Sequence, residues 1–139
     1  MKHSVTNRLV IGKTIGFIAG LAVFLLAPLI GITLDVKFGL GLILFYTMVG
    51  AFTAFVGIFD RHPVLNFAMP WWFRGLAIGI IMHVMLVLLS YDQLAVMLQQ
   101  MDFLGMVSPW WAVIDGAILG LIMAFAETKI AGEGKIPLK

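Results

Sequence analysis

Four long apolar runs dominate this 139-residue chain and restrict what it can fold into. Read between polar breaks, they cover residues 9–34, 39–59, 71–91 and 110–127. A helix needs about 20 mostly apolar residues to cross the hydrocarbon layer of a bilayer, because each residue adds about 1.5 Å. None of the runs alternates apolar with polar residues, as a membrane barrel requires. The runs therefore predict four transmembrane helices.

The composition excludes a soluble domain. Apolar residues make up 62% of the chain and charged residues 12%, whereas a soluble domain has about 45–50% and about 25%. Too few charges are present to cover a surface that faces water. We therefore expect an all-α polytopic membrane protein, with residues 1–139 forming a single four-helix transmembrane domain in the plasma (bacterial inner) membrane and lipid as its surroundings.

The distribution of Lys and Arg predicts the orientation. Cytoplasmic loops carry the excess of positive charge. If the N-terminus is cytoplasmic, Lys37 alone falls on the outer side. Both termini are therefore predicted to be cytoplasmic. The basic residues on that side are Lys2, Arg8, Lys13, Arg61, Arg74, Lys129, Lys135 and Lys139.

Two Pro-Trp-Trp motifs, beginning at Pro70 and Pro109, open the third and fourth runs. Trp prefers the headgroup level of a bilayer, and Pro is tolerated at the start of a helix. We interpret these Trp residues and the neighbouring arginine as interfacial anchors. The predicted anchors are Trp71, Trp72, Arg74, Trp110 and Trp111.

Residues 92–102 have an amphipathic pattern. Their polar side chains, such as Asp92 and Gln99, fall on one helical face, while Leu94, Met97 and Leu98 fall on the other. Such a pattern is typical of a helix at a membrane surface. We expect a short helix that either lies in the outer interface or prolongs the third span.

Small residues recur at helical spacing in every span. Helices in lipid associate through close van der Waals contact, which favours small residues spaced by four. The pattern predicts a tightly packed bundle, in which Phe45, Phe52, Phe55 and Phe59 of the second helix face lipid. The predicted packing residues are Gly12, Gly16, Gly20, Gly50, Ala54, Gly57, Gly75, Gly79, Gly116 and Gly120.

Three ionisable residues, Lys13, His83 and Asp115, are predicted to lie inside the bilayer. Each costs roughly 2.5–3.5 kcal/mol on insertion scales and so needs a partner or a function. Lys13 is close enough to the cytoplasmic edge to extend its amine to the headgroups. His83 follows Arg74 by enough residues to lie about 14 Å deep, near the midplane.

The predicted polar site consists of His83, Asp115, Thr47 and Ser90. We expect His83 to bond Thr47 or a backbone carbonyl, and Asp115 to bond Ser90 or the outer backbone. The two ionisable groups differ in height by about 8 Å, so a direct hydrogen bond between them would need a bridging water. A structural role and a polar path for protons or ions both remain open for these residues.

Catalytic, metal and cofactor motifs are absent from the sequence. It has no Cys, no HExxH motif or carboxylate cluster, and no Gly-rich nucleotide loop. Its sparse charges do not suit nucleic acid. We therefore expect a non-enzymatic protein that acts through helix packing, as a homo-oligomer or as an accessory subunit of a larger membrane complex. The alternative is a small proton-coupled or ion-conducting transporter that uses His83 and Asp115 in an oligomer.

Overall fold

A computed structural model of the chain describes residues 5–62, 64–101, 105 and 107–132. The described part is built from helices, and the predicted all-helical architecture is confirmed. Four segments are long and apolar enough to cross a membrane, with the 3₁₀ helix η1 counted as a continuation of α1. The elements are α1 (Val5–Leu26), η1 (Ala27–Ile30), α2 (Val36–Val56), α3 (Trp71–Leu89), α4 (Tyr91–Gln99) and α5 (Trp111–Ala131).

The first predicted span is divided where a proline interrupts it. Pro28 lies in the first turn of η1, and Gly31 then closes that helix with a left-handed φ of 83°. The next helix starts before the predicted residue 39, because the side chain of Asp35 accepts a hydrogen bond of 3.0 Å from the backbone N–H of Phe38. An N-terminal cap of this kind satisfies a donor that the helix itself leaves unpaired.

The later spans also end at local backbone changes. Helix α3 ends at Leu89, and Ser90, with φ of −133°, separates it from α4. The amphipathic segment is therefore a separate helix and not a prolongation of α3, while its predicted end at Asp102 lies outside the described residues. Helix α5 continues beyond the predicted residue 127 to Ala131, and Gly132 follows with φ of 79°.

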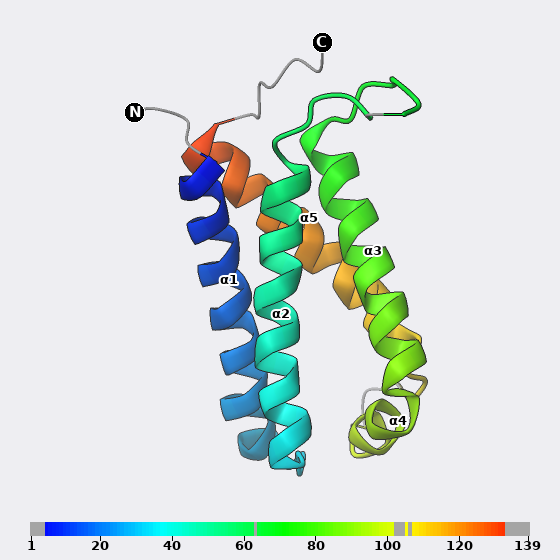
Figure 1. Cartoon of the computed structure of the whole chain (residues 1–139). Coiled ribbons are helices and arrows are strands. Elements are labelled where there is room, and N and C mark those ends of the chain that lie inside the picture. Colours follow the sequence, from blue (N-terminus) through cyan, green and yellow to red (C-terminus); the bar gives the residue numbers. More distant parts are fainter. Residues whose placement is uncertain (1–4, 63, 102–104, 106, 133–139) are drawn as a thin grey trace.

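The long helices form two pairs, α1 with α2 and α3 with α5 (Figure 1). In the first pair, a Cβ on Gly50 would overlap the carbonyl oxygen of Gly12. In the second, a Cβ on Gly79 would overlap the carbonyl oxygen of Gly116. The glycines of these seams therefore bring two backbones into direct contact within each pair, as small residues do in membrane helices.

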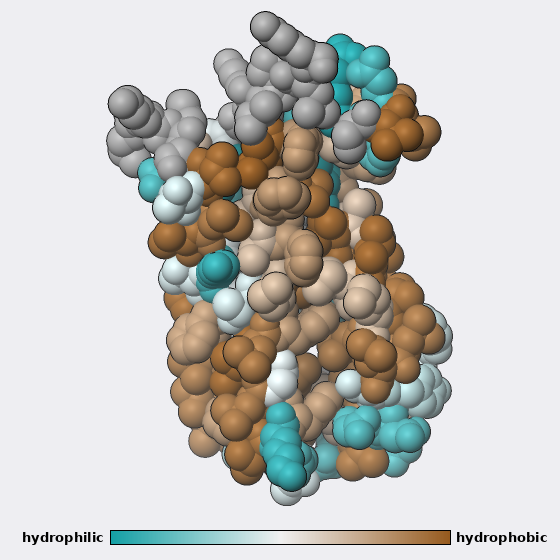
Figure 2. Space-filling model, viewed as in Figure 1, coloured by the Kyte–Doolittle hydropathy of each residue, from teal (hydrophilic) through white to brown (hydrophobic). Residues whose placement is uncertain are grey.

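The two ends of the bundle differ in what they contain. At the terminal end, α1 begins and α5 ends, and the segment between α2 and α3 lies beside them (Figure 1). At the opposite end, which we call the pocket end, η1 and α4 face each other. Helix α5 runs obliquely behind the other helices and contacts both α3 and α1. Figure 2 shows mostly hydrophobic surface between more hydrophilic patches near the two ends.

Candidate functional site

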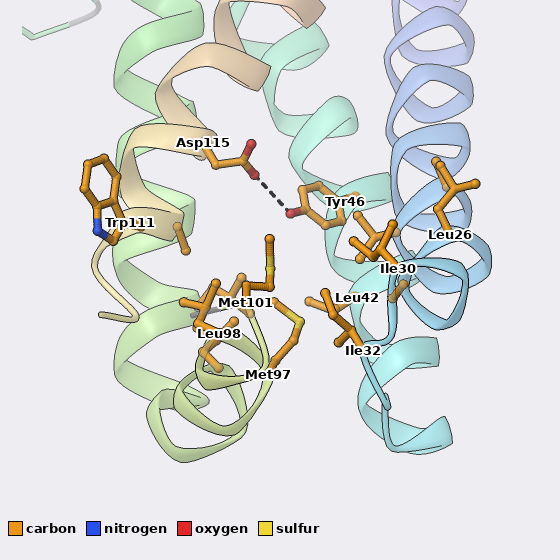
Figure 3. Close-up of a pocket in the computed structure, with 16 residues that line it drawn as sticks. Leu26, Ile30, Ile32, Leu42, Tyr46, Met97, Leu98, Met101, Trp111 and Asp115 are labelled. Carbon is orange, nitrogen blue, oxygen red and sulfur yellow. Dashed lines mark hydrogen bonds between the residues drawn. The ribbon is translucent and has the colours of Figure 1, made fainter. Parts of the chain in front are cut away.

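A pocket of about 420 Å³ opens between the two helix pairs at the pocket end (Figure 3). Its walls come from α1, η1, α2, α3, α4 and α5, and most of the lining side chains are aliphatic. Tyr46 and Asp115 are the ionisable residues among the described lining residues. The pocket is therefore an apolar space with one polar corner.

Tyr46 and Asp115 form that polar corner across the two helix pairs. The Tyr46 hydroxyl, on α2, donates to Oδ2 of Asp115, on α5, over 3.4 Å (Figure 3). Tyr46 is 7% exposed, whereas Asp115 is exposed at the pocket wall. Tyr46 is thus the side chain that reaches Asp115, in place of the predicted Ser90. Ser90 instead ends α3, where its backbone N–H donates to the carbonyl of Leu86 over 2.9 Å.

His83 lies next to this corner and is 0% exposed. Its Nδ1 lies 2.9 Å from the carbonyl oxygen of Gly79, which can only accept, so Nδ1 carries the proton in this contact. Nε2 has no hydrogen-bond partner among the described residues. The ring fits here because residue 116 is glycine, and a Cβ at Gly116 would overlap the imidazole.

Two residues of α2, Thr47 and Phe45, make contacts that differ from those we expected. Thr47 donates to the carbonyl of Ile43 in its own helix over 2.7 Å. We expected the imidazole to bond either Thr47 or a backbone carbonyl, and the structure shows the carbonyl of Gly79. Phe45, expected to face lipid, packs edge-on against His83 with ring centroids 5.2 Å apart. Whether this face of α2 meets lipid or protein depends on where α3 crosses it, and the sequence of α2 alone does not show this.

Tyr46 connects the two predicted ionisable residues. Its ring centroid lies 5.6 Å from that of His83, and its hydroxyl bonds Asp115. The phenol therefore contacts both groups for which we expected a bridging water. The sequence analysis did not select Tyr46, although it shares a helical face with Gly50 and Thr53, both of which are buried.

A second polar cluster, formed by Arg8, Glu127 and Arg74, lies at the terminal end. Nη2 of Arg8, on α1, lies 3.7 Å from Oε2 of Glu127, on α5. Nη1 of Arg8 also donates to the carbonyl of Gly132. The side chains of Arg8 and Glu127 are 5% and 0% exposed, so this ion pair joins the helix pairs inside the bundle.

Arg74 was expected to be an interfacial anchor, and the structure buries it instead. Its side chain is 3% exposed, and Nη1 donates to the carbonyl of Phe59 over 2.5 Å. The predicted anchors Trp72, Trp110 and Trp111 are exposed, whereas Trp71 is half-buried against Phe125.

An apolar layer separates the two polar regions. Val49 lies between Tyr46 and Thr53 along α2, and Met123 lies between Asp115 and Glu127 along α5. Both Val49 and Met123 are fully buried. Neither side chain offers water a strong hydrogen bond, so this layer is poorly suited to hold water between the two polar regions.

No known family model, curated protein or solved structure matches this chain. In the described ranges, no group of three or more His, Asp or Glu side chains is arranged to hold a metal ion. The site must therefore be interpreted from its own geometry.

Proposed function

We propose that this protein is a small non-enzymatic carrier that couples the movement of a ligand or ion to protons. The supporting observation is the contrast between the two ends. The helix pairs enclose a pocket at one end, and at the other they are joined by the buried pair Arg8–Glu127. A carrier needs a site that is open to one side while the other side is closed.

His83 and Asp115 are the proposed proton-exchanging groups. Asp115 is reached from the pocket, and the His83 ring lies against Gly116, the next residue of α5, and beside the ring of Tyr46. The unpartnered Nε2 of His83 gives this group a free acceptor within the bundle. Glu127, level with Gly12, provides the next carboxylate toward the terminal end, and a Cβ on Gly12 would lie 2.6 Å from its Oε1.

Proton-driven flux in liposomes tests this proposal. The wild-type chain should show pH-driven flux that His83→Gln abolishes, because the amide keeps polarity but cannot carry a proton at neutral pH. His62→Gln, in the loop at the terminal end, is the control and should leave flux unchanged. Flux at background in the wild-type protein, or full flux in His83→Gln, would contradict the proposal.

We further propose that the terminal end faces the cytoplasm of a bacterial cell, so that the pocket opens outward. The excess of Lys and Arg predicted for this side of the membrane, against Lys37 alone on the other side, supports this orientation. The chain has no Cys, so single cysteines can be labelled without background. Gln93→Cys on α4 should react with an impermeant maleimide in intact cells, and Asn66→Cys only after lysis. The reverse pattern would overturn the orientation.

The alternative proposal is a packing subunit, either of a homo-oligomer or of a larger membrane complex. The predicted glycine seams make contacts within the chain, as at Gly12 with Gly50 and Gly75 with Gly120. An assembly would therefore need other surfaces. Native mass spectrometry of the detergent-extracted protein gives the copy number, and stable co-purifying subunits together with background flux would favour this alternative.

A further inference from the structure

We infer that the pocket binds an organic cation with an apolar body, its positive charge placed against the carboxylate of Asp115. This inference names the ligand class of the proposed carrier and rests on that proposal for the transport step. Binding itself can be measured without transport.

The charge of the pocket favours a cation. Asp115 is the one carboxylate among the described lining residues, and none of them is Lys, Arg or His. Its observed partner is the neutral hydroxyl of Tyr46, at 3.4 Å. The residue follows Trp110 closely enough to lie about 8 Å below the membrane surface, where an unpaired charge is costly. A bound cation would supply the charge that the protein does not.

The walls of the pocket favour an apolar body. Aliphatic side chains such as Leu42, Leu86 and Leu98 come from three different helices and surround the space. Met97 and Met101, on the α4 side, are unbranched and can adapt to different shapes (Figure 3). Such walls stabilise hydrocarbon and offer few hydrogen bonds to a sugar or an anion.

Size and aromatic content agree with this ligand class. A volume of about 420 Å³ lies within the range of about 300–1,000 Å³ found for small-molecule sites. Trp111 and Tyr46 also line the pocket. Aromatic faces attract cations, most strongly where water is excluded. A compact cation bearing several rings or short chains matches the space, the charge and the aromatic lining together.

Two ions of nearly equal shape and opposite charge test the inference. Tetraphenylphosphonium and tetraphenylborate are both apolar, and equilibrium dialysis against the full chain in detergent measures their binding. We expect the phosphonium ion to bind and the borate ion to remain at background. Equal binding of both ions would show a non-selective apolar cavity and would overturn the inference.

Substitutions identify the pocket as the site. Asp115→Asn should weaken phosphonium binding at least tenfold, whereas Asp115→Glu should retain most of it. Leu98→Trp should block binding by filling the space without a change in charge. The control Asp60→Asn removes a carboxylate near the terminal end and should have no effect. Unchanged binding in Asp115→Asn or in Leu98→Trp would overturn the inference.

The ligand class and the carrier function can be contradicted independently by the binding and transport measurements. Charge-selective binding that depends on Asp115, together with background flux, would support the inference and contradict the proposed carrier. Proton-driven flux without phosphonium binding would support the carrier and contradict this ligand class.

Discussion

At the scale of single residues, glycines create the space in which polar side chains are buried. A Cβ on Gly57 would overlap the guanidinium of Arg8, and one on Gly116 would overlap the ring of His83. Gly12 similarly leaves room for the carboxylate of Glu127. The small residues thus serve two purposes, since some bring backbones together and others accommodate charged or polar groups.

Backbone contact between helices makes Gly50 intolerant of even one methyl group. Gly50→Ala places a Cβ against the carbonyl of Gly12 and should lower the free energy of unfolding by about 1–3 kcal/mol, the usual cost of overpacking. Gly41→Ala is the matched control, because a Cβ at Gly41 meets open space. It should be neutral or stabilise by up to about 1 kcal/mol through helix propensity. Equilibrium denaturation in mixed micelles measures both, and equal effects would contradict the close crossing.

The ion pair at the terminal end should couple its two residues strongly. Glu127→Leu leaves the Arg8 charge buried without its carboxylate and should destabilise by about 3–5 kcal/mol. In the double variant Arg8→Met/Glu127→Leu, the Arg8 charge is removed as well, and Arg74 keeps its hydrogen bond to the carbonyl of Phe59, so part of the loss should be recovered. A double-mutant cycle in the same denaturation experiment gives the coupling energy, and additive losses would show that the two side chains act independently.

Sequence reasoning located some of the polar residues within the spans and missed others for a physical reason. His83 and Asp115 stand well inside apolar runs, where any ionisable residue attracts attention. Arg8, Arg74 and Glu127 stand near the ends of their spans, where a long side chain can reach water or turn inward. Whether such a side chain turns inward depends on which neighbouring helix crosses its own helix at the same depth in the bundle. Glu127 did carry a signal, because it continues the buried face of Gly116 and Gly120.

At the scale of elements, hydropathy predicted which segments are helical better than where they end. The ends are set by local chemistry, such as the Asp35 cap and the change of direction at Ser90. Helix α4 was predicted from its two faces, and the structure buries the apolar side chains Leu94 and Leu98. These residues also line the pocket opposite η1, and this could be seen only from the arrangement of the helices.

One glutamine side chain ties α4 to the first helix pair. Oε1 of Gln100 accepts hydrogen bonds from the backbone N–H and the hydroxyl of Thr33, over 2.7 and 2.8 Å. Gln100→Ala should release the end of α4 and speed its amide hydrogen exchange several-fold, with about 1 kcal/mol or less lost in global stability. Gln99→Ala, at the exposed neighbouring position, is the control. Unchanged exchange in Gln100→Ala would show that packing alone holds α4.

At the scale of the whole molecule, the sequence did not predict which helices pair. Each of the four long helices carries small residues at helical spacing, so each could have packed on any other. The pairing depends on which glycines reach the same height, as Gly12 does with Gly50 and Gly79 with Gly116. The contacts between the pairs are made by side chains, among them the Tyr46–Asp115 corner, the terminal ion pair and a buried apolar cluster that joins α2 to α3 and α4.

This division predicts how the molecule moves if it is a carrier. Each pair should move as a rigid unit, because backbone contacts at glycines leave no side chain that could adjust, whereas contacts between the pairs are side-chain contacts that can break and reform. Distances within and between the pairs can be measured by pulsed electron paramagnetic resonance, with spin labels on cysteines that replace exposed residues. The sites are Val10 on α1, Phe52 on α2, Ile81 on α3 and Ile122 on α5.

Distances within a pair, 10 to 52 and 81 to 122, should stay unchanged when tetraphenylphosphonium is added at different pH values. The distance from 10 to 122 crosses between the pairs near the Arg8–Glu127 contact, so its distribution should shift or broaden as that contact opens. The Glu127→Leu variant removes the ion pair and should show the broadened distribution without ligand. Within-pair distances that change as much as the distance between pairs would mean that the glycine contacts do not hold the helices as units. A carrier mechanism would then have to depend on movements of single helices.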